Sequence, residues 1–210
     1  MQQDVARRQW VRHRALCPLC EAGLPCAFAE GLRATAEGRE HGRPAPAATL
    51  YVGRRLTVRL PDGRGQVVHE VRIVGGGALP PRLDLAAWSP RDWDWGREGP
   101  GARQLALGLL AHVLGDDARA LARCRAFATE VVARLPADGW RLGAGQLRYV
   151  LGEAVGEPWP VQDLSGEPVG AERPGPGKRR PQVVLQVLPG GKGLDEVPRE
   201  AVPSDPSEDG

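Results

Sequence analysis

Apolar and polar residues alternate along residues 54–74, and this pattern predicts a β-hairpin. Leu56, Val58 and Leu60 alternate with arginine and threonine, and the same two-residue period returns at 66–74. P-D-G-R-G at 61–65 has the composition of a turn, because proline fixes φ and glycine accepts positive φ. The fragment R-L-D-L at 82–85 is expected to add a third strand.

After residue 88 the apolar spacing becomes helical. Apolar residues cover most of the circumference over 102–114, which predicts a buried helix that ends at Gly115. Asp116 is expected to cap a second, amphipathic helix, and a shorter third helix follows Trp140. The predicted fold class is α+β, with a small antiparallel sheet packed by two to three helices over 50–155.

Two segments of different composition flank this core. Residues 1–45 form a Cys-rich, Arg-rich arm with a short helix after Cys26, followed by the linker-like R-P-A-P-A-A. Residues 156–210 are rich in proline, glycine and acidic residues, so we expect a flexible, disordered tail. Within it, the aliphatic run 182–188 is a candidate docking strand.

The core also resembles a known family. Its hallmark is W-D-W-G-R-E-G-P-G-A-R-Q-L-A-L-G-L-L at 93–110, with Y-V-G-R-R at 51–55 before it and L-P-x-x-x-W-R-L at 135–142 after it. These strings resemble an uncharacterised prokaryotic and mobile-element family, domain of unknown function 6166, over about residues 50–152. The resemblance implies a compact α+β module and carries neither an activity nor catalytic residues.

Three of the four cysteines fall within ten residues, as Cys17, Cys20 and Cys26. The chain has no apolar run long enough to span a membrane and no apolar leader, so we expect a cytoplasmic protein with reduced thiols. Such a cluster then indicates a metal or redox site rather than a disulfide scaffold. Cys124 lies on the apolar stripe of its helix and is expected to be a small buried hydrophobe.

The cluster predicts a metal centre, with zinc as the first choice. Two cysteines two residues apart can reach one ion from a tight turn, and a tetrahedral zinc site needs four ligands. His13 is the nearest fourth candidate and His41 the second. An iron–sulfur cluster is the alternative, since the spacing is similar to the last three cysteines of WhiB-like regulators, although the first is absent here. Free packed thiols and redox switching stay open.

Basic residues suggest a nucleic-acid contact in the arm. On a helix, Trp10 would lie within a basic surface suited to phosphate backbones. The chain has 26 arginines against two lysines and a net charge of only +2, so an ordinary solvated face is the competing interpretation. The candidate nucleic-acid-binding residues are Arg7, Arg8, Arg12 and Arg14.

The glycine-rich loop before residue 102 is a candidate anion site. A helix that begins there exposes free N–H groups and a partial positive charge. The competing interpretation is a tight turn in which Pro100 starts a buried helix, with Trp93 and Trp95 packed into the core. The candidate anion-binding residues are Arg97, Gly99, Gly101 and Arg103.

The leading functional hypothesis is a non-catalytic, metal-stabilised binding or regulatory module that contacts nucleic acid or a nucleoprotein complex. The sequence contains no nucleophile–base pair and no H-E-x-x-H motif, so an enzyme is the less favoured class. Two alternatives stay open. One is a small enzyme acting on a phosphate-bearing substrate, and the other is a protein–protein adaptor that docks through its C-terminal tail. No membrane partner is expected.

Overall fold

A computed structural model of the 210-residue chain describes residues 2–38 and 42–153. The predicted tail at 156–210, its candidate strand at 182–188, and His41 lie outside the described residues. Within the described ranges, none of the helices combines the length and apolar character that crossing a bilayer requires. The elements in chain order are α1 (Gln2–Leu16), α2 (Pro18–Glu21), α3 (Ala27–Ala36), β1 (Leu50–Arg59), β2 (Gly65–Ile73), α4 (Pro100–Leu114), α5 (Asp117–Glu130), a 3-10 turn (Val132–Arg134), β3 (Gly139–Gly143) and α6 (Ala144–Val150).

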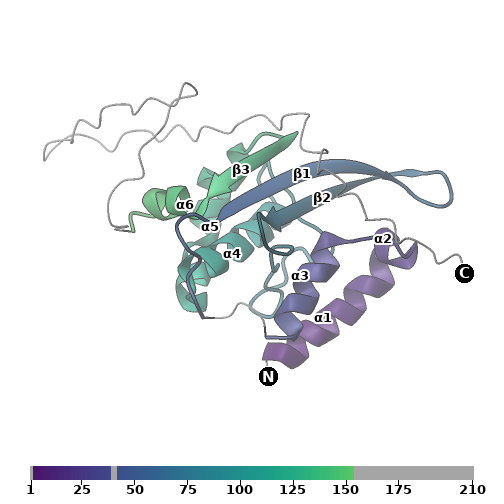
Figure 1. Cartoon of the computed structure of the whole chain (residues 1–210), viewed down its shortest axis with the longest axis horizontal. Coiled ribbons are helices and arrows are strands. Elements are labelled where there is room, and N and C mark those ends of the chain that lie inside the picture. Colours follow the sequence, from purple (N-terminus) through teal and green to yellow (C-terminus); the bar gives the residue numbers. More distant parts are fainter. Residues whose placement is uncertain (1, 39–41, 154–210) are drawn as a thin grey trace, which may run out of the picture.

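The predicted hairpin and the α+β class are confirmed. β1 pairs antiparallel with β2 from Tyr51 opposite Ile73 to Arg59 opposite Gly65. β1 also pairs antiparallel with β3, but only over Leu50–Arg54, so the strand order is β2-β1-β3. The hairpin therefore continues beyond the third strand and projects from the body of the molecule (Figure 1).

The third strand is not at 82–85, and that prediction was wrong. Arg82 has a left-handed φ of 53°, and its buried guanidinium pairs with Asp84 and Asp117, so this fragment turns instead of extending. β3 has only five residues, of which the first and the last are glycines, with Trp140 and Leu142 as its alternating buried side chains. That pattern is too short to separate from the start of the helix that follows it.

The predicted buried helix is α4, which lies at the centre of the core. Twelve of its fifteen residues are buried, and the rings of Trp93 and Trp95 are buried beside it. The predicted helix end and cap are also present: Gly115 has φ 61°, and the Asp116 side chain accepts a hydrogen bond from the Arg119 N–H. The packing interpretation of the two tryptophans is therefore confirmed.

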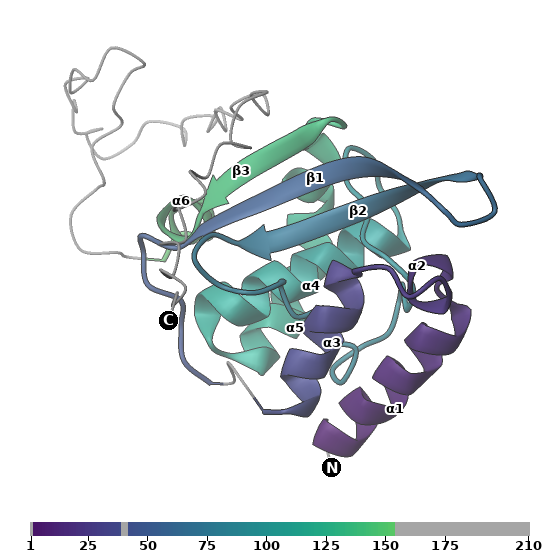
Figure 2. The same cartoon turned by 45° about the vertical axis from the view of Figure 1, so that its right-hand side comes forward.

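The N-terminal arm packs against the rest of the protein. α1 lies along α3 at the periphery of the molecule (Figure 2), and Phe28 and Leu32 of α3 belong to the main core. A smaller apolar cluster joins Cys17 and Leu19 to Leu60 at the end of the hairpin. The cysteine segment therefore lies between α1 and the projecting hairpin.

Gly53 of β1 gives a first prediction. It is paired with Trp140 of β3, and a Cβ at residue 53 would lie 2.2–2.5 Å from atoms of the Trp140 ring. We expect Gly53→Ala to lower the free energy of unfolding by about 2–3 kcal/mol, because a buried ring must move. Gly65→Ala on the same hairpin is the matched control, since its Cβ would meet only Thr57 Cγ2 at 3.5 Å. Urea unfolding of both variants measures the difference in their free energies of unfolding. Equal losses of stability in the two variants would contradict this prediction.

Candidate metal centre

Four side chains with metal-binding atoms converge where α1, α2 and α3 meet. His13 comes from the last turn of α1, Cys17 precedes α2, Cys20 lies within α2, and Cys26 precedes α3. Their ligand atoms all lie within 4.8 Å of one another. The structure thus brings together all four predicted metal ligands, which we call the histidine–cysteine group.

The local sequence explains how three cysteines that are close in sequence reach one point. Pro18 starts α2 directly after Cys17, and Gly23, with φ 70°, turns the chain back toward Cys26. Cys17 and Cys26 occupy the N-cap positions of α2 and α3, yet neither side chain makes a capping hydrogen bond. Both sulfurs face the cluster.

The distances between the ligand atoms suit a tetrahedral ion. The bond lengths for zinc, about 2.3 Å to sulfur and 2.0 Å to nitrogen, give ligand separations of roughly 3.5–3.8 Å in a tetrahedron. Cys17 Sγ lies 4.0 Å from Cys26 Sγ, and His13 Nε2 lies 3.4 Å from Cys26 Sγ. These two separations lie within a few tenths of an ångström of the zinc values, and the four ligand atoms together, spread over up to 4.8 Å, would close by about 1 Å around an ion.

His13 is already oriented as a ligand. The residue is 2% exposed, its ring stacks on Phe28 at 5.1 Å, and its Nδ1 lies 3.4 Å from the carbonyl oxygen of Pro90. Because a carbonyl can only accept, the tautomer that satisfies this contact carries its proton on Nδ1, and in that tautomer the Nε2 lone pair is directed to the sulfurs. In metal-bound histidines, a hydrogen bond from the second ring nitrogen fixes the orientation of the ring and its tautomer.

The three thiols affect one another's protonation strongly. Hydrogen bonding from Cys26 lowers the pKa of Cys17, whereas burial raises the pKa of Cys20. The hydrogen bond to Cys17 and burial together raise the pKa of Cys26. A single thiolate is thus stabilised by its neighbours, and the other two would ionise only when a cation balances their charge. The histidine–cysteine group could therefore hold a metal ion.

Cys124 takes no part in this group. It is fully buried on α5, and its Sγ–H donates to the Leu121 carbonyl at 3.2 Å. The interpretation of Cys124 as a small core residue is confirmed.

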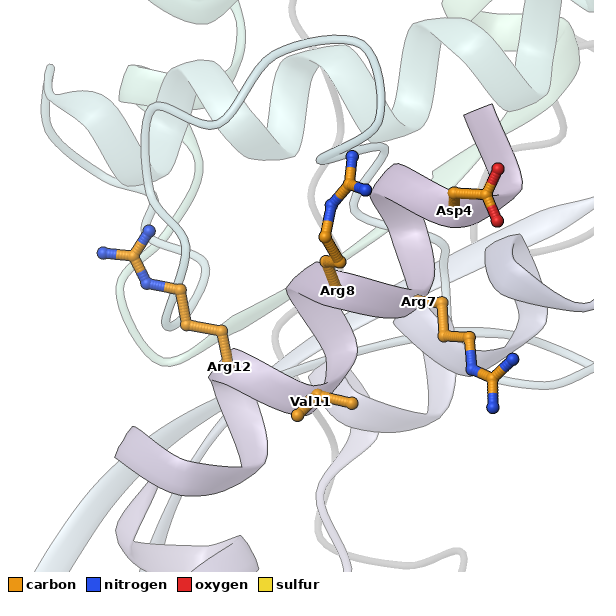
Figure 3. A pocket seen from close by; sticks show the side chains of 5 residues that line it. All are labelled: Asp4, Arg7, Arg8, Val11 and Arg12. Carbon is orange, nitrogen blue, oxygen red and sulfur yellow. The ribbon is translucent and has the colours of Figure 1, made fainter. Parts of the chain in front are cut away.

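The four candidate nucleic-acid-binding arginines all project from α1 into solvent. Arg8 and Arg12 extend on one side of the helix, Arg7 extends on the other, and Val11 lies between them (Figure 3). A shallow hollow of about 400 Å³ is lined by Asp4, Arg7, Arg8, Val11 and Arg12. Arg14 stacks over Trp10, with its guanidinium carbon 5.1 Å from the ring centre. The opposite face of α1, with Ala6 and His13, is buried.

The glycine-rich loop does begin α4, with Gly99 preceding it and no side-chain cap. Its two arginines have different partners: Arg97 Nε donates to Asp94 Oδ2 at 2.5 Å, and Arg103 stacks on Trp88 at 3.9 Å. Gly101 is buried, and a Cβ there would lie 2.6 Å from Asp94 Cβ. The Asp94 carboxylate thus already provides a negative charge beside this loop, and binding of an external anion stays a prediction.

Two features of the centre carry no sequence signal. The Pro90 carbonyl lies 77 residues from His13, and any residue could supply it. The contact of Leu19 with Leu60 joins two ordinary leucines. Only the ligands themselves have a spacing that the sequence reveals.

Fold and site together define a small α+β domain that carries an N-terminal group of one histidine and three cysteines. Residues 51–153 match the model of the family of unknown function DUF6166. The match confirms the resemblance, and the histidine–cysteine group precedes the matched residues. No curated protein and no solved structure matches the chain.

Proposed function

We propose that this protein is a non-catalytic, metal-stabilised binding module that contacts nucleic acid through α1. The observation that carries the proposal is the convergence of His13, Cys17, Cys20 and Cys26 within 4.8 Å at the end of a helix with an exposed basic face. A metal at this point would fix the position of that helix.

Zinc is the metal that the ligands favour. One imidazole and three thiolates form a common closed, structural zinc set, whereas an iron–sulfur cluster of the usual kind takes four thiolates. Cys124 would have to supply the fourth thiolate, and it is buried on α5. A closed set of four protein ligands leaves no position for a substrate, which supports a structural role.

The basic face of α1 supports phosphate contact. None of Arg7, Arg8 and Arg12 forms an ion pair with another residue that the structure describes. Exposed, unpaired guanidinium groups can therefore approach backbone phosphates without first breaking an internal contact. Val11, 57% exposed between them, adds a small apolar area to the same surface.

Charge reversal on α1 tests this function. We expect the zinc-loaded double variant Arg8→Glu/Arg12→Glu to lose at least about tenfold in affinity for labelled DNA and RNA. The slope of log K against log salt should also fall by about 2, because two phosphate contacts are lost. Fluorescence anisotropy at several salt concentrations measures both quantities.

The matched control is Arg125→Glu/Arg134→Glu, which changes the net charge equally at exposed positions after α4. It should keep the wild-type slope. Wild-type protein that binds neither DNA nor RNA, or an α1 variant that binds as the wild type does, would refute the proposed function.

A further inference from the structure

The outer half of the β1–β2 hairpin is a two-stranded ribbon without a third strand. β3 covers β1 only as far as Arg54, so Arg55–Arg59 pair with β2 alone among the described residues. Figures 1 and 2 both show this half extending past the helices, at the end of the molecule where α2 lies.

The hairpin and α1 account for the whole positive charge of the described residues. Residues 50–73 hold five arginines against Asp62 and Glu70, and α1 holds four arginines against Asp4. The remaining described residues, 17–38, 42–49 and 74–153, carry equal numbers of arginines and acids. An arginine-rich composition alone would not place the excess in two elements.

Within the hairpin, two arginines are exposed and unpaired. Arg54 and Arg59 form no ion pair with any other described residue. By contrast, Arg55 lies 3.7 Å from Asp94, and Arg72 lies 2.6 Å from Glu70. Because residues 54 and 59 are an odd number of positions apart on the same strand, their side chains project from opposite faces of the ribbon.

We propose that this ribbon is a second nucleic-acid contact and that its partner is double-stranded DNA. The proposal rests on the proposed function and extends it. The major groove of B-DNA admits a two-stranded β-ribbon, and the exposed arginines of such a ribbon can contact the backbone phosphates beside the groove. The major groove of A-form RNA is too narrow for such an element.

The hairpin also lacks what single-strand binding requires. Stacking of unpaired bases uses exposed aromatic rings, and the only aromatic residue of Trp, Tyr or Phe type in β1 and β2 is Tyr51, which is buried. This absence favours a duplex as the ligand.

The segment that carries the histidine–cysteine group packs against the outer half of the hairpin. Leu60, at the end of β1, packs with Cys17 and Leu19, and Val58 and Val68 pack against the same cluster. A metal that orders this segment would therefore hold α1 and the hairpin in a fixed relation. The two basic elements would then contact the same duplex.

The test compares double charge reversals in the zinc-loaded full chain. We expect Arg54→Glu/Arg59→Glu to weaken binding to a labelled 20-base-pair DNA duplex at least about tenfold, with a salt slope lower by about 2. Binding to an RNA duplex of the same sequence should change much less. Arg125→Glu/Arg134→Glu is again the control, and Arg54→Gln/Arg59→Gln replaces the reversal if circular dichroism shows misfolding.

The outcomes separate this inference from the proposed function. If the hairpin variant binds DNA as the wild type does while Arg8→Glu/Arg12→Glu does not, the hairpin contact is refuted and the α1 contact stands. If the hairpin variant loses RNA and DNA binding equally, the assignment to DNA is overturned. If neither element matters for any nucleic acid, both proposals fall.

Discussion

Replacing Cys26 by serine is expected to abolish stoichiometric zinc binding. Cys26 Sγ contacts both His13 and Cys17, so it is central to the histidine–cysteine group, and a serine hydroxyl is a poor zinc ligand. The zinc content of purified protein should fall from about one ion per chain to near zero, because a structural site needs all four ligands. Elemental analysis after growth in zinc-supplemented medium measures this change.

The structural effect of Cys26→Ser should be local and large. α1 has few fully buried residues, among them Ala6 and His13, whereas α4 is buried within the main core. Without the ion we expect α1 and α2 to lose hydrogen-exchange protection while 101–114 keeps it. Treating the wild-type protein with a strong chelator should give the same pattern.

Cys124→Ala is the matched control for this prediction. It removes the one cysteine outside the group, so it should keep both the ion and the protection of α1. A Cys26→Ser protein with wild-type zinc content, or one without zinc whose α1 stays fully protected, would contradict the assigned role of the histidine–cysteine group.

Local patterns were sufficient to predict most of the elements. The two-residue period of 54–60 and the helical spacing of 102–114 depend on neighbours in sequence, and both elements appear as expected. β3 depends on pairing with a strand about 90 residues earlier, and its five residues carry too short a pattern to show this. Long-range pairing is therefore what the sequence alone did not reveal.

The same distinction applies to the site. Cys17, Cys20 and Cys26 could be identified from spacing, and His13 from its position four residues before the first cysteine. The Pro90 carbonyl that orients His13 comes from a loop placed by the tertiary fold. The contact between the hairpin and the cysteine segment likewise arises from packing of ordinary apolar residues, which form no recognisable motif in the sequence.

Arg82→Met is expected to be the most damaging substitution outside the metal centre. The Arg82 guanidinium donates to both carboxylate oxygens of Asp117 at 2.7 Å and to Asp84 at 3.0–3.3 Å. Burial alone would lower the pKa of Arg82, but the hydrogen bonds to Asp117 and Asp84 raise it overall, so the cation is firmly held. Removing it leaves the fully buried Asp84 carboxylate unpaired, at a cost of about 3–5 kcal/mol.

A second substitution shows whether the unpaired carboxylate is the cause. Asp84→Asn in the Arg82→Met background should recover a large part of the lost stability, since a neutral amide is far cheaper to bury than a carboxylate. Asp117→Asn should recover less, because the Asp117 side chain is 36% exposed and water screens its charge. The exposed Arg91→Met is the surface control and should change the free energy of unfolding by less than about 0.5 kcal/mol. Urea unfolding of the zinc-loaded proteins measures the stability of all four variants. If Asp84→Asn does not reduce the stability loss of Arg82→Met, packing rather than charge accounts for the effect.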